Sequence, residues 1–209
     1  MTEIPSNNLP PMAAGVISRA KDILLKPKET WPVIAAEPAT TQSIYVPYVV
    51  LLAAIGPLAG FIGGQLFGIS VLGITYHPPL VGALVTAIVT YGLSLATVFI
   101  LAIVIDGLAP SFGGQKDQVQ ALKVAAYAGT AGWVGGIFGL IPALGIIGLL
   151  FALYGLYLLY LGLPVLMKAP QDKAIGYTVV VIIVYIVLFL IIGAVVGALA
   201  APSLVSIRG

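Results

Sequence analysis

The feature that most constrains the fold is a long stretch, residues 38–105, without a single lysine, arginine, aspartate or glutamate. In the whole chain only 8% of residues are charged and 60% are hydrophobic, whereas a soluble domain carries roughly 25% charged residues. Water would not solvate such a surface, so the expected solvent is a lipid bilayer. There the backbone must pair its own polar groups, which leaves helices or closed barrels. Because the apolar runs are continuous and lack the alternating polarity of barrel strands, the sequence predicts an all-α integral membrane bundle.

The lengths of the uncharged runs predict five membrane-spanning helices. A span needs about 20 apolar residues, so residues 38–105 hold two spans, with a loop at 75–79. The next uncharged run, 124–167, also holds two, with the turn near Pro142 and Gly145. The expected spans are 44–68, 80–105, 120–140, 144–167 and 177–201.

The positions of the basic residues predict the orientation of the spans. Lysines and arginines fall in the segment before the first span and in the loops after the second and fourth spans, apart from Arg208 in the tail. Cytoplasmic loops are the basic ones in membrane proteins. We therefore expect a cytoplasmic N-terminus and a C-terminus on the periplasmic or outer side.

The N-terminal segment is expected to lie on the membrane surface. Residues 1–11 are predicted to be a disordered tail, 12–43 an interfacial helix with a proline-rich connector, 44–201 the membrane domain and 202–209 a C-terminal tail. In the helix one face is apolar and the opposite face carries most of the charge, a pattern typical of interfacial helices. The apolar face consists of Met12, Val16, Ala20, Ile23 and Leu24. The alternative is a cytosolic lead-in that contacts nothing.

The prolines and the tryptophan of this segment define the connector. Pro27 is expected to end the helix, and Pro32 and Pro38 to keep the following residues extended. Trp31 suits the depth of the lipid headgroups. The connector is therefore expected to link the surface helix to the first span.

Small residues at four-residue spacing predict close helix packing. The first span carries a glycine ridge, made of Gly56, Gly60, Gly64 and Gly68. The second span carries a strip of small residues with hydroxyl groups, made of Gly82, Thr86, Thr90 and Ser94. We expect these two spans to pack within one chain, with hydroxyls bonding across the contact; self-association through the ridge is the alternative. Pro57 is expected to kink the first span.

Charged residues of two loops form a candidate cytosolic docking face, made of Asp106, Lys116, Asp117, Lys168, Asp172 and Lys173. The alternative is that they serve only as a topology signal and for solvation. Asp106 also raises a proton-coupling hypothesis, because acidic residues near the membrane are often functional. A pairing of Asp106 with Lys116 or Lys123 is the simpler expectation.

Catalytic, cofactor and metal chemistry finds no support in the sequence. The chain has no cysteine, and His77 is its only histidine, so a histidine or cysteine metal cluster is not expected. We find no acid–base or nucleophile constellation and expect neither an enzyme nor a bound cofactor. The net charge of +2 is too small to indicate nucleic-acid binding.

Three stretches together resemble Yip1-domain membrane proteins of the bacterial branch, over about residues 15–200. They are ILLKPKETWPVIAAEPAT, DGLAPSFGGQKDQVQALKVAAYAGTAGWVGGIFGLIPALG and YLLYLGLPVLMKAPQDKAIGYTVVV. The resemblance implies five membrane helices with a cytosolic N-terminus, in a bacterial inner membrane. Eukaryotic members associate with Rab GTPases and are linked to vesicle formation. This chain lacks their long acidic and aromatic tail, so the resemblance does not extend to Rab binding.

Two classes of function follow as hypotheses. The first is a non-enzymatic, membrane-organising or scaffold protein whose partners are the lipid bilayer, a second copy or another membrane protein. The second is a transport component or facilitator for a small neutral or lipophilic solute. It requires a polar path, for which the candidates are Gln65, Thr86, Thr90, Ser94 and Thr97. Lipid binding with Lys116 and Lys168 at the headgroups is a third possibility.

Overall fold

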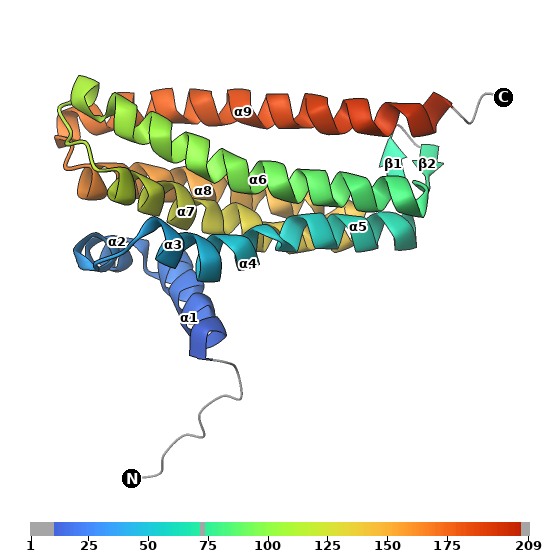
Figure 1. The fold of residues 1–209 in the computed structure, drawn as a ribbon, viewed down its shortest axis with the longest axis horizontal. Helices are drawn as coiled ribbons and strands as arrows, with labels where there is room; N and C mark the ends of the chain where they lie inside the picture. Colours follow the sequence, from blue (N-terminus) through green and yellow to red (C-terminus); the bar gives the residue numbers. More distant parts are fainter. Residues whose placement is uncertain (1–10, 72–73, 206–209) are drawn as a thin grey trace, which may run out of the picture.

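Long apolar helices dominate the computed structural model, which describes residues 11–71 and 74–205 (Figure 1). The helices are α1 (Pro11–Leu25), α2 (Pro27–Ala36), α3 (Thr41–Ile44), α4 (Val50–Ala53), α5 (Ile55–Phe67), α6 (Leu80–Leu108), α7 (Gln118–Gly135), α8 (Gly145–Leu166) and α9 (Gln171–Val205). Shorter helical segments are the π-helix η1 (Tyr45–Val49) and the 3-10 turns η2 (Ala109–Phe112), η3 (Gly136–Leu140) and η4 (Pro142–Leu144). The strands are β1 (Ile69–Val71) and β2 (Ile74–Tyr76).

Four segments of the described chain are long and apolar enough to cross a membrane. They are Thr41–Phe67, Leu80–Phe112, Gly145–Leu166 and Gln171–Ala198. The all-α, multi-pass membrane class predicted from composition is therefore confirmed. The predicted third span, 120–140, coincides with α7 and η3 but is not among these four segments.

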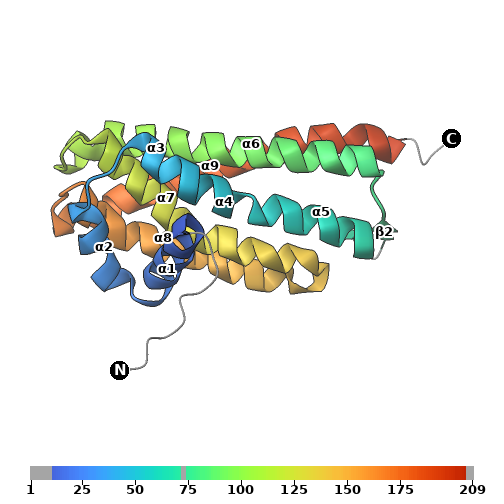
Figure 2. The same cartoon turned by 60° about the horizontal axis from the view of Figure 1, so that its bottom comes forward.

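The chain runs back and forth along one bundle axis (Figures 1 and 2). It passes along the bundle in α3–α5, returns in α6, passes again in α7, returns in α8 and passes a last time in α9. The connections 109–117 and 167–170 therefore lie at the end that holds α2. The β1–β2 hairpin and the end of α9 lie at the other end (Figure 1).

The first long segment is interrupted where its prolines lie. Thr40 and Ser43 form a capping box that starts α3, and a π-helix follows around Pro47. A turn at Ala54 then separates α4 from α5, three residues before Pro57, which has no N–H to donate to the preceding turn. The irregularity expected from Pro57 is thus present, and the predicted single span 44–68 is a chain of short helices.

The loop expected between the first two long segments is present, and a two-stranded hairpin forms part of this connection. β1 and β2 pair antiparallel, with Ile69 opposite Tyr76. Gly68 ends α5 with a φ of 73°, a left-handed conformation that glycine adopts without strain. The predicted start of the second span at residue 80 agrees with the first residue of α6.

Helix α7 lies in the middle of the bundle and carries mostly small residues. It packs against α6 and α8 and also contacts α1, α3 and α5. Its inward-facing residues include Ala121, Val124, Ala126 and Ala131, all fully buried. Small side chains let several helices approach one central helix closely.

The N-terminal segment differs from the expected surface connector. Pro27 does end α1, but Pro32 does not keep the chain extended, because residues 27–36 form α2. The chain is extended at Glu37, just before Pro38. Pro27 occupies the first helical position, where its missing N–H would be unpaired in any case. Trp31 is 1% exposed, so its ring packs against protein inside the bundle.

The apolar face of α1 is turned toward protein. Val16 and Ala20 pack in one cluster with Tyr48 and Leu52 of the first long segment. The side chain of Met12 and the expected tail residues 1–10 lie outside the described residues. At the other end α9 continues to Val205, past the predicted boundary at 201.

Candidate functional site

Two charged connections meet at one end of the bundle, which we call the basic end and define as α2, residues 109–117 and residues 167–173. The backbone N–H of Gln115 donates to the carbonyl of Met167 at 2.8 Å. The rings of Phe112 and Tyr177 stack with centroids 4.9 Å apart and planes 5° apart. These contacts join the second and fourth connections at this end of the bundle.

Five of the six predicted docking residues are exposed at this end of the bundle, and one of them also caps a helix. The side chains of Lys116, Asp117, Lys168, Asp172 and Lys173 are all exposed. Asp117 has a structural task as well, because its Oδ1 accepts hydrogen bonds at 3.0 Å from the backbone N–H groups of Val119 and Gln120. It is the N-cap of α7, a position where aspartate is strongly favoured.

Asp106 does not form the ion pair expected of it. Among the described residues, neither Lys116 nor Lys123 pairs with Asp106, and Oδ1 of Asp106 is buried without a hydrogen-bond partner. The neighbouring carbonyl of Ile105 accepts a hydrogen bond from the hydroxyl of Tyr177. The expectation fails because Lys123 points toward α2, on another side of the bundle.

Lys123 holds the end of α2, a role that the sequence analysis missed. The side chain is 2% exposed, and its Nζ donates to the carbonyl of Ile34 at 2.8 Å and to that of Glu37 at 2.6 Å. One turn earlier, Nε2 of Gln120 donates to the carbonyl of Ala35 at 3.0 Å. The last carbonyls of a helix lack partners within it, so side chains of α7 satisfy those of α2.

Helix α1 is tied to the bundle in the same way. Arg19 forms an ion pair with Glu37, and the hydroxyl of Tyr154 donates to the carbonyl of Leu24, at the end of α1, at 2.8 Å. Segments far apart in the sequence therefore share one polar network around α2.

Trp31 anchors α2 in the bundle through packing. Its ring lies against Gly162 of α8, where a Cβ would come within 2.7 Å of the indole. Its edge meets the ring of Tyr127, at a centroid distance of 6.5 Å. The N-terminal segment is thus a packed part of the bundle, and a glycine on α8 makes room for it.

The first two long segments do pack against each other within the chain, but the glycine ridge of the first segment approaches η3 and not the strip on α6. A Cβ on Gly63 would lie 2.3 Å from the carbonyl oxygen of Gly139, and one on Gly136 would lie 2.8 Å from the Cα of Gly56. The closest approach of α5 is therefore to η3. Added Cβ atoms on Gly60 and Gly82 meet nothing within 4 Å, and Gly68 ends the helix.

The hydroxyl strip of α6 does not bond across to the first segment as expected. Ser94 donates to the carbonyl of Tyr91 and Thr97 to that of Leu93, both in their own helix. Thr86 and Thr90 are half-buried. Two tyrosines make the bonds between the segments. Tyr45 donates to the carbonyl of Leu95 at 2.8 Å, and Tyr91 to that of Val50 at 2.9 Å.

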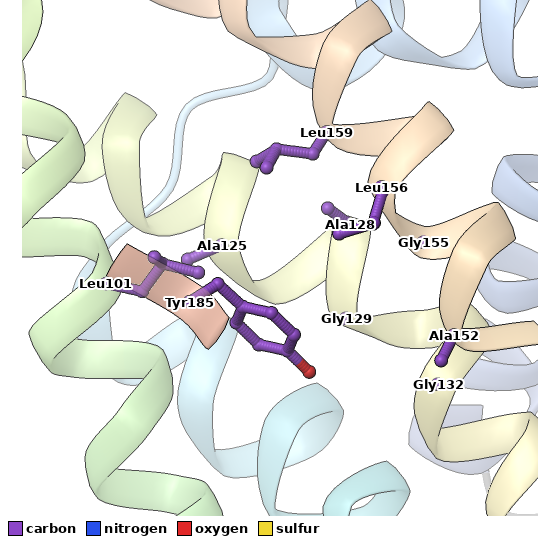
Figure 3. Close-up of a pocket in the computed structure, with 10 residues that line it drawn as sticks. All are labelled: Leu101, Ala125, Ala128, Gly129, Gly132, Ala152, Gly155, Leu156, Leu159 and Tyr185. Carbon is purple, nitrogen blue, oxygen red and sulfur yellow. The ribbon is translucent and has the colours of Figure 1, made fainter. Parts of the chain in front are cut away.

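A small apolar cavity of about 50 Å³ lies between α6, α7, α8 and α9 (Figure 3). Its walls are mostly small side chains of α7 and α8, and Tyr185 of α9 reaches over it (Figure 3). Gln65 is not part of it, since its Nε2 donates to the carbonyl of Pro78 at 3.1 Å. None of the residues proposed for a polar path lines this cavity.

Metal-ligating residues do not cluster in the part of the chain that the structure describes: no group of three or more His, Cys, Asp or Glu side chains is placed to hold an ion.

One family model matches most of the chain: the Yip1 domain model aligns with residues 21–193. The matched range begins in α1 and ends in α9, so it includes the basic end and every long helix. Comparison with curated proteins gives no match, and comparison with solved structures gives none either.

Proposed function

The chain belongs to the Yip1 domain family, and from that premise we propose that it is a non-enzymatic membrane-organising or scaffold protein. Its docking surface is the basic end of the bundle, and its partner is another membrane protein or a second copy. The bilayer holds the long helices, and the charged side chains at the basic end are what the protein presents to the aqueous phase.

The observation that supports this proposal is the bond between Gln115 and Met167, which joins the two charged connections. Three exposed lysines, Lys116, Lys168 and Lys173, thereby lie on one surface whose backbone is already ordered. A preorganised surface loses less conformational entropy on binding than a flexible one. Exposed lysines also steer acidic partners toward the surface.

We further infer five membrane crossings, with α7 and η3 as the fifth. Helix α7 is covered by α6 and α8, so most of its surface meets protein and not lipid. A helix in that position does not need an apolar surface of its own. In the back-and-forth path of the chain, the connection 140–145 lies at the end opposite the basic end, and this supports a crossing by α7 (Figure 1).

The orientation follows from the same charges. The basic end would be cytoplasmic, with the C-terminus on the periplasmic side of a bacterial inner membrane. Helix α1 runs across the direction of the long helices (Figure 1), and the exposed apolar side chains of Ile17 and Leu25 suit a helix at the membrane interface.

The transport alternative receives less support. The hydroxyls of Ser94 and Thr97 are bonded within α6, and the intramembrane cavity is small and apolar. A solute path would need polar groups that are open to a solute. We therefore favour the scaffold role.

The scaffold role is tested by crosslinking the protein in its native membrane and identifying what co-purifies in stoichiometric amount. The double variant Lys168→Glu, Lys173→Glu should lose a partner that the wild-type protein captures. The matched control is Lys21→Glu, an exposed lysine on α1, which should keep the partner. If the wild-type protein is recovered alone, the scaffold role is wrong, and solute flux in liposomes becomes the next measurement.

A further inference from the structure

A second cavity, of about 250 Å³, opens at the basic end beside α2. It lies between α2, the last turns of α8 and the first turn of α9. The residues that line it are Lys28, Trp31, Tyr160, Leu161, Pro164, Val165, Gln171 and Ala174. None of the three lysines proposed above for docking, Lys116, Lys168 and Lys173, lines it.

Three polar side chains line this cavity without a partner among the residues that the structure describes. Lys28 forms no ion pair with any described residue. The hydroxyl of Tyr160 and the amide of Gln171 likewise make no hydrogen bond to the described part of the chain. The lining therefore offers an ammonium, a hydroxyl and an amide, all of which can donate hydrogen bonds.

The backbone adds to the positive character of the cavity. Lys28 lies in the first turn of α2, which begins at Pro27, and Gln171 begins α9. The N-terminus of a helix carries free N–H groups and a partial positive charge, and it favours anions. No acidic side chain lines the cavity, although Glu29 and Asp172 are sequence neighbours of lining residues.

The position of the cavity indicates where such an anion would come from. Tyr160 and Val165 are 40% and 39% exposed on α8, a helix long and apolar enough to cross the membrane. One wall, made of Leu161, Pro164 and Val165, is apolar. A cavity at the end of a membrane helix that has a cationic part and an apolar part matches a phospholipid. The cationic part suits the phosphate, and the apolar part suits the acyl chains.

We propose that this cavity binds the phosphate headgroup of an anionic phospholipid of the surrounding bilayer. Lys28 provides the charge, Tyr160 and Gln171 provide hydrogen bonds, and the wall of α8 contacts the upper part of the acyl chains. Because the lining holds an ammonium and no carboxylate, it has no anionic partner for the amine or choline of a neutral headgroup. The site thus selects lipids of net negative charge, independently of any protein partner.

The test uses the full chain with Trp133→Phe, which leaves Trp31 in the cavity as the only tryptophan. The protein is reconstituted in phosphatidylcholine vesicles that contain a small fraction of phosphatidylglycerol, and one lipid at a time carries brominated acyl chains that quench tryptophan. Brominated phosphatidylglycerol should quench Trp31 more strongly than the same fraction of brominated phosphatidylcholine. Native mass spectrometry of the wild-type protein should show retained phosphatidylglycerol.

The variant Lys28→Gln removes the charge at an exposed position and should weaken phosphatidylglycerol binding about five- to tenfold, the loss expected for one lysine near a membrane surface. Lys21→Gln is the matched control, because Lys21 is an exposed lysine that does not line the cavity. It should bind as the wild type does. The melting temperature of both variants should equal that of the wild type.

Two results would overturn the proposal. The first is equal quenching by the two brominated lipids, or phosphatidylglycerol binding that Lys28→Gln leaves unchanged. The second is displacement of the lipid by millimolar inorganic phosphate or glycerol 3-phosphate, which would assign the site to a soluble anion and not to the bilayer.

Discussion

The ammonium of Lys123 lies 2.6 Å from the carbonyl oxygen of Glu37, so a buried cation of the central helix holds the end of an N-terminal helix 86 residues earlier in the chain. A buried charge is costly unless it is hydrogen-bonded. Here its second bond, to the carbonyl of Ile34, and the nearby carboxylate of Glu37 offset part of that cost. The position of α2 therefore depends on the charged ammonium of Lys123 on α7.

Lys123→Met should release α2 while it keeps most of the side-chain volume. The carbonyls of Ile34 and Glu37 would then be left unsatisfied, which costs about 1–3 kcal/mol each where they are buried. We expect the free energy of unfolding in detergent micelles to fall by about 2–4 kcal/mol. Hydrogen exchange should rise in residues 27–37 before it rises elsewhere. Lys116→Met, at an exposed position, is the control and should change neither quantity.

Gly162→Ala should loosen the same helix by steric conflict. The new methyl group would lie 2.7 Å from the ring of Trp31, and overpacking of this kind typically costs about 1–3 kcal/mol. Near-ultraviolet circular dichroism should report the displaced indole, and the melting temperature should fall. Gly145→Ala, in the same helix with open space around it, should leave both unchanged. If the two variants behave alike, Trp31 is not packed on α8 as described.

Much of the fold could be predicted because its signals are local in the sequence. Spans end where charged residues and prolines occur, so the predicted starts at 80 and 144 lie within one residue of α6 and α8. The helix α2 could not be predicted in this way, because Pro27 and Pro32 indicate a break by themselves. Its formation depends on the pocket for Trp31 and on the side chains that bond its carbonyls, which are distant in the sequence.

Part of the candidate site could also be predicted, because the charged loops are visible locally in the sequence. Topology alone places the loops that carry Lys116 and Lys168 at one end of the bundle. The role of Lys123 depends on which side of α7 meets α2, and no local pattern gives that. One signal was available: Lys123 lies between Leu122 and Val124 in a run of small and apolar residues, which is typical of a buried position and not of a loop.

The contact between α5 and η3 can be tested with two glycines of α5, Gly60 of the ridge and Gly63 beside it. Gly63→Ala places a methyl group 2.3 Å from the carbonyl oxygen of Gly139, and that backbone atom cannot move aside alone. We expect a loss of at least about 1–3 kcal/mol in the free energy of unfolding. Gly60→Ala meets open space and should be nearly neutral.

The variants Gly60→Ala and Gly63→Ala also distinguish packing of the ridge within one chain from self-association of two chains. If the ridge joined two copies, Gly60→Ala would lower the apparent molecular mass in size-exclusion chromatography with light scattering. A Gly60→Ala protein with unchanged mass and stability, beside a destabilised Gly63→Ala protein, agrees with the contact between α5 and η3.

The crossing of α7 can be tested by cysteine labelling, because the chain has no cysteine of its own. Single cysteines at Lys116 and Ala143 flank α7 and η3, and both positions are exposed. If α7 crosses the bilayer, a membrane-impermeant maleimide should label the two from opposite sides in right-side-out and inverted vesicles. Two further single cysteines, at the exposed positions Lys168 and His77, are references for the two ends of the bundle. The cysteine at 168 should be labelled from the same side as that at 116, and the cysteine at 77 from the same side as that at 143. Labelling of positions 116 and 143 from the same side would leave only four crossings and would place η3 on the same side of the membrane as the basic end.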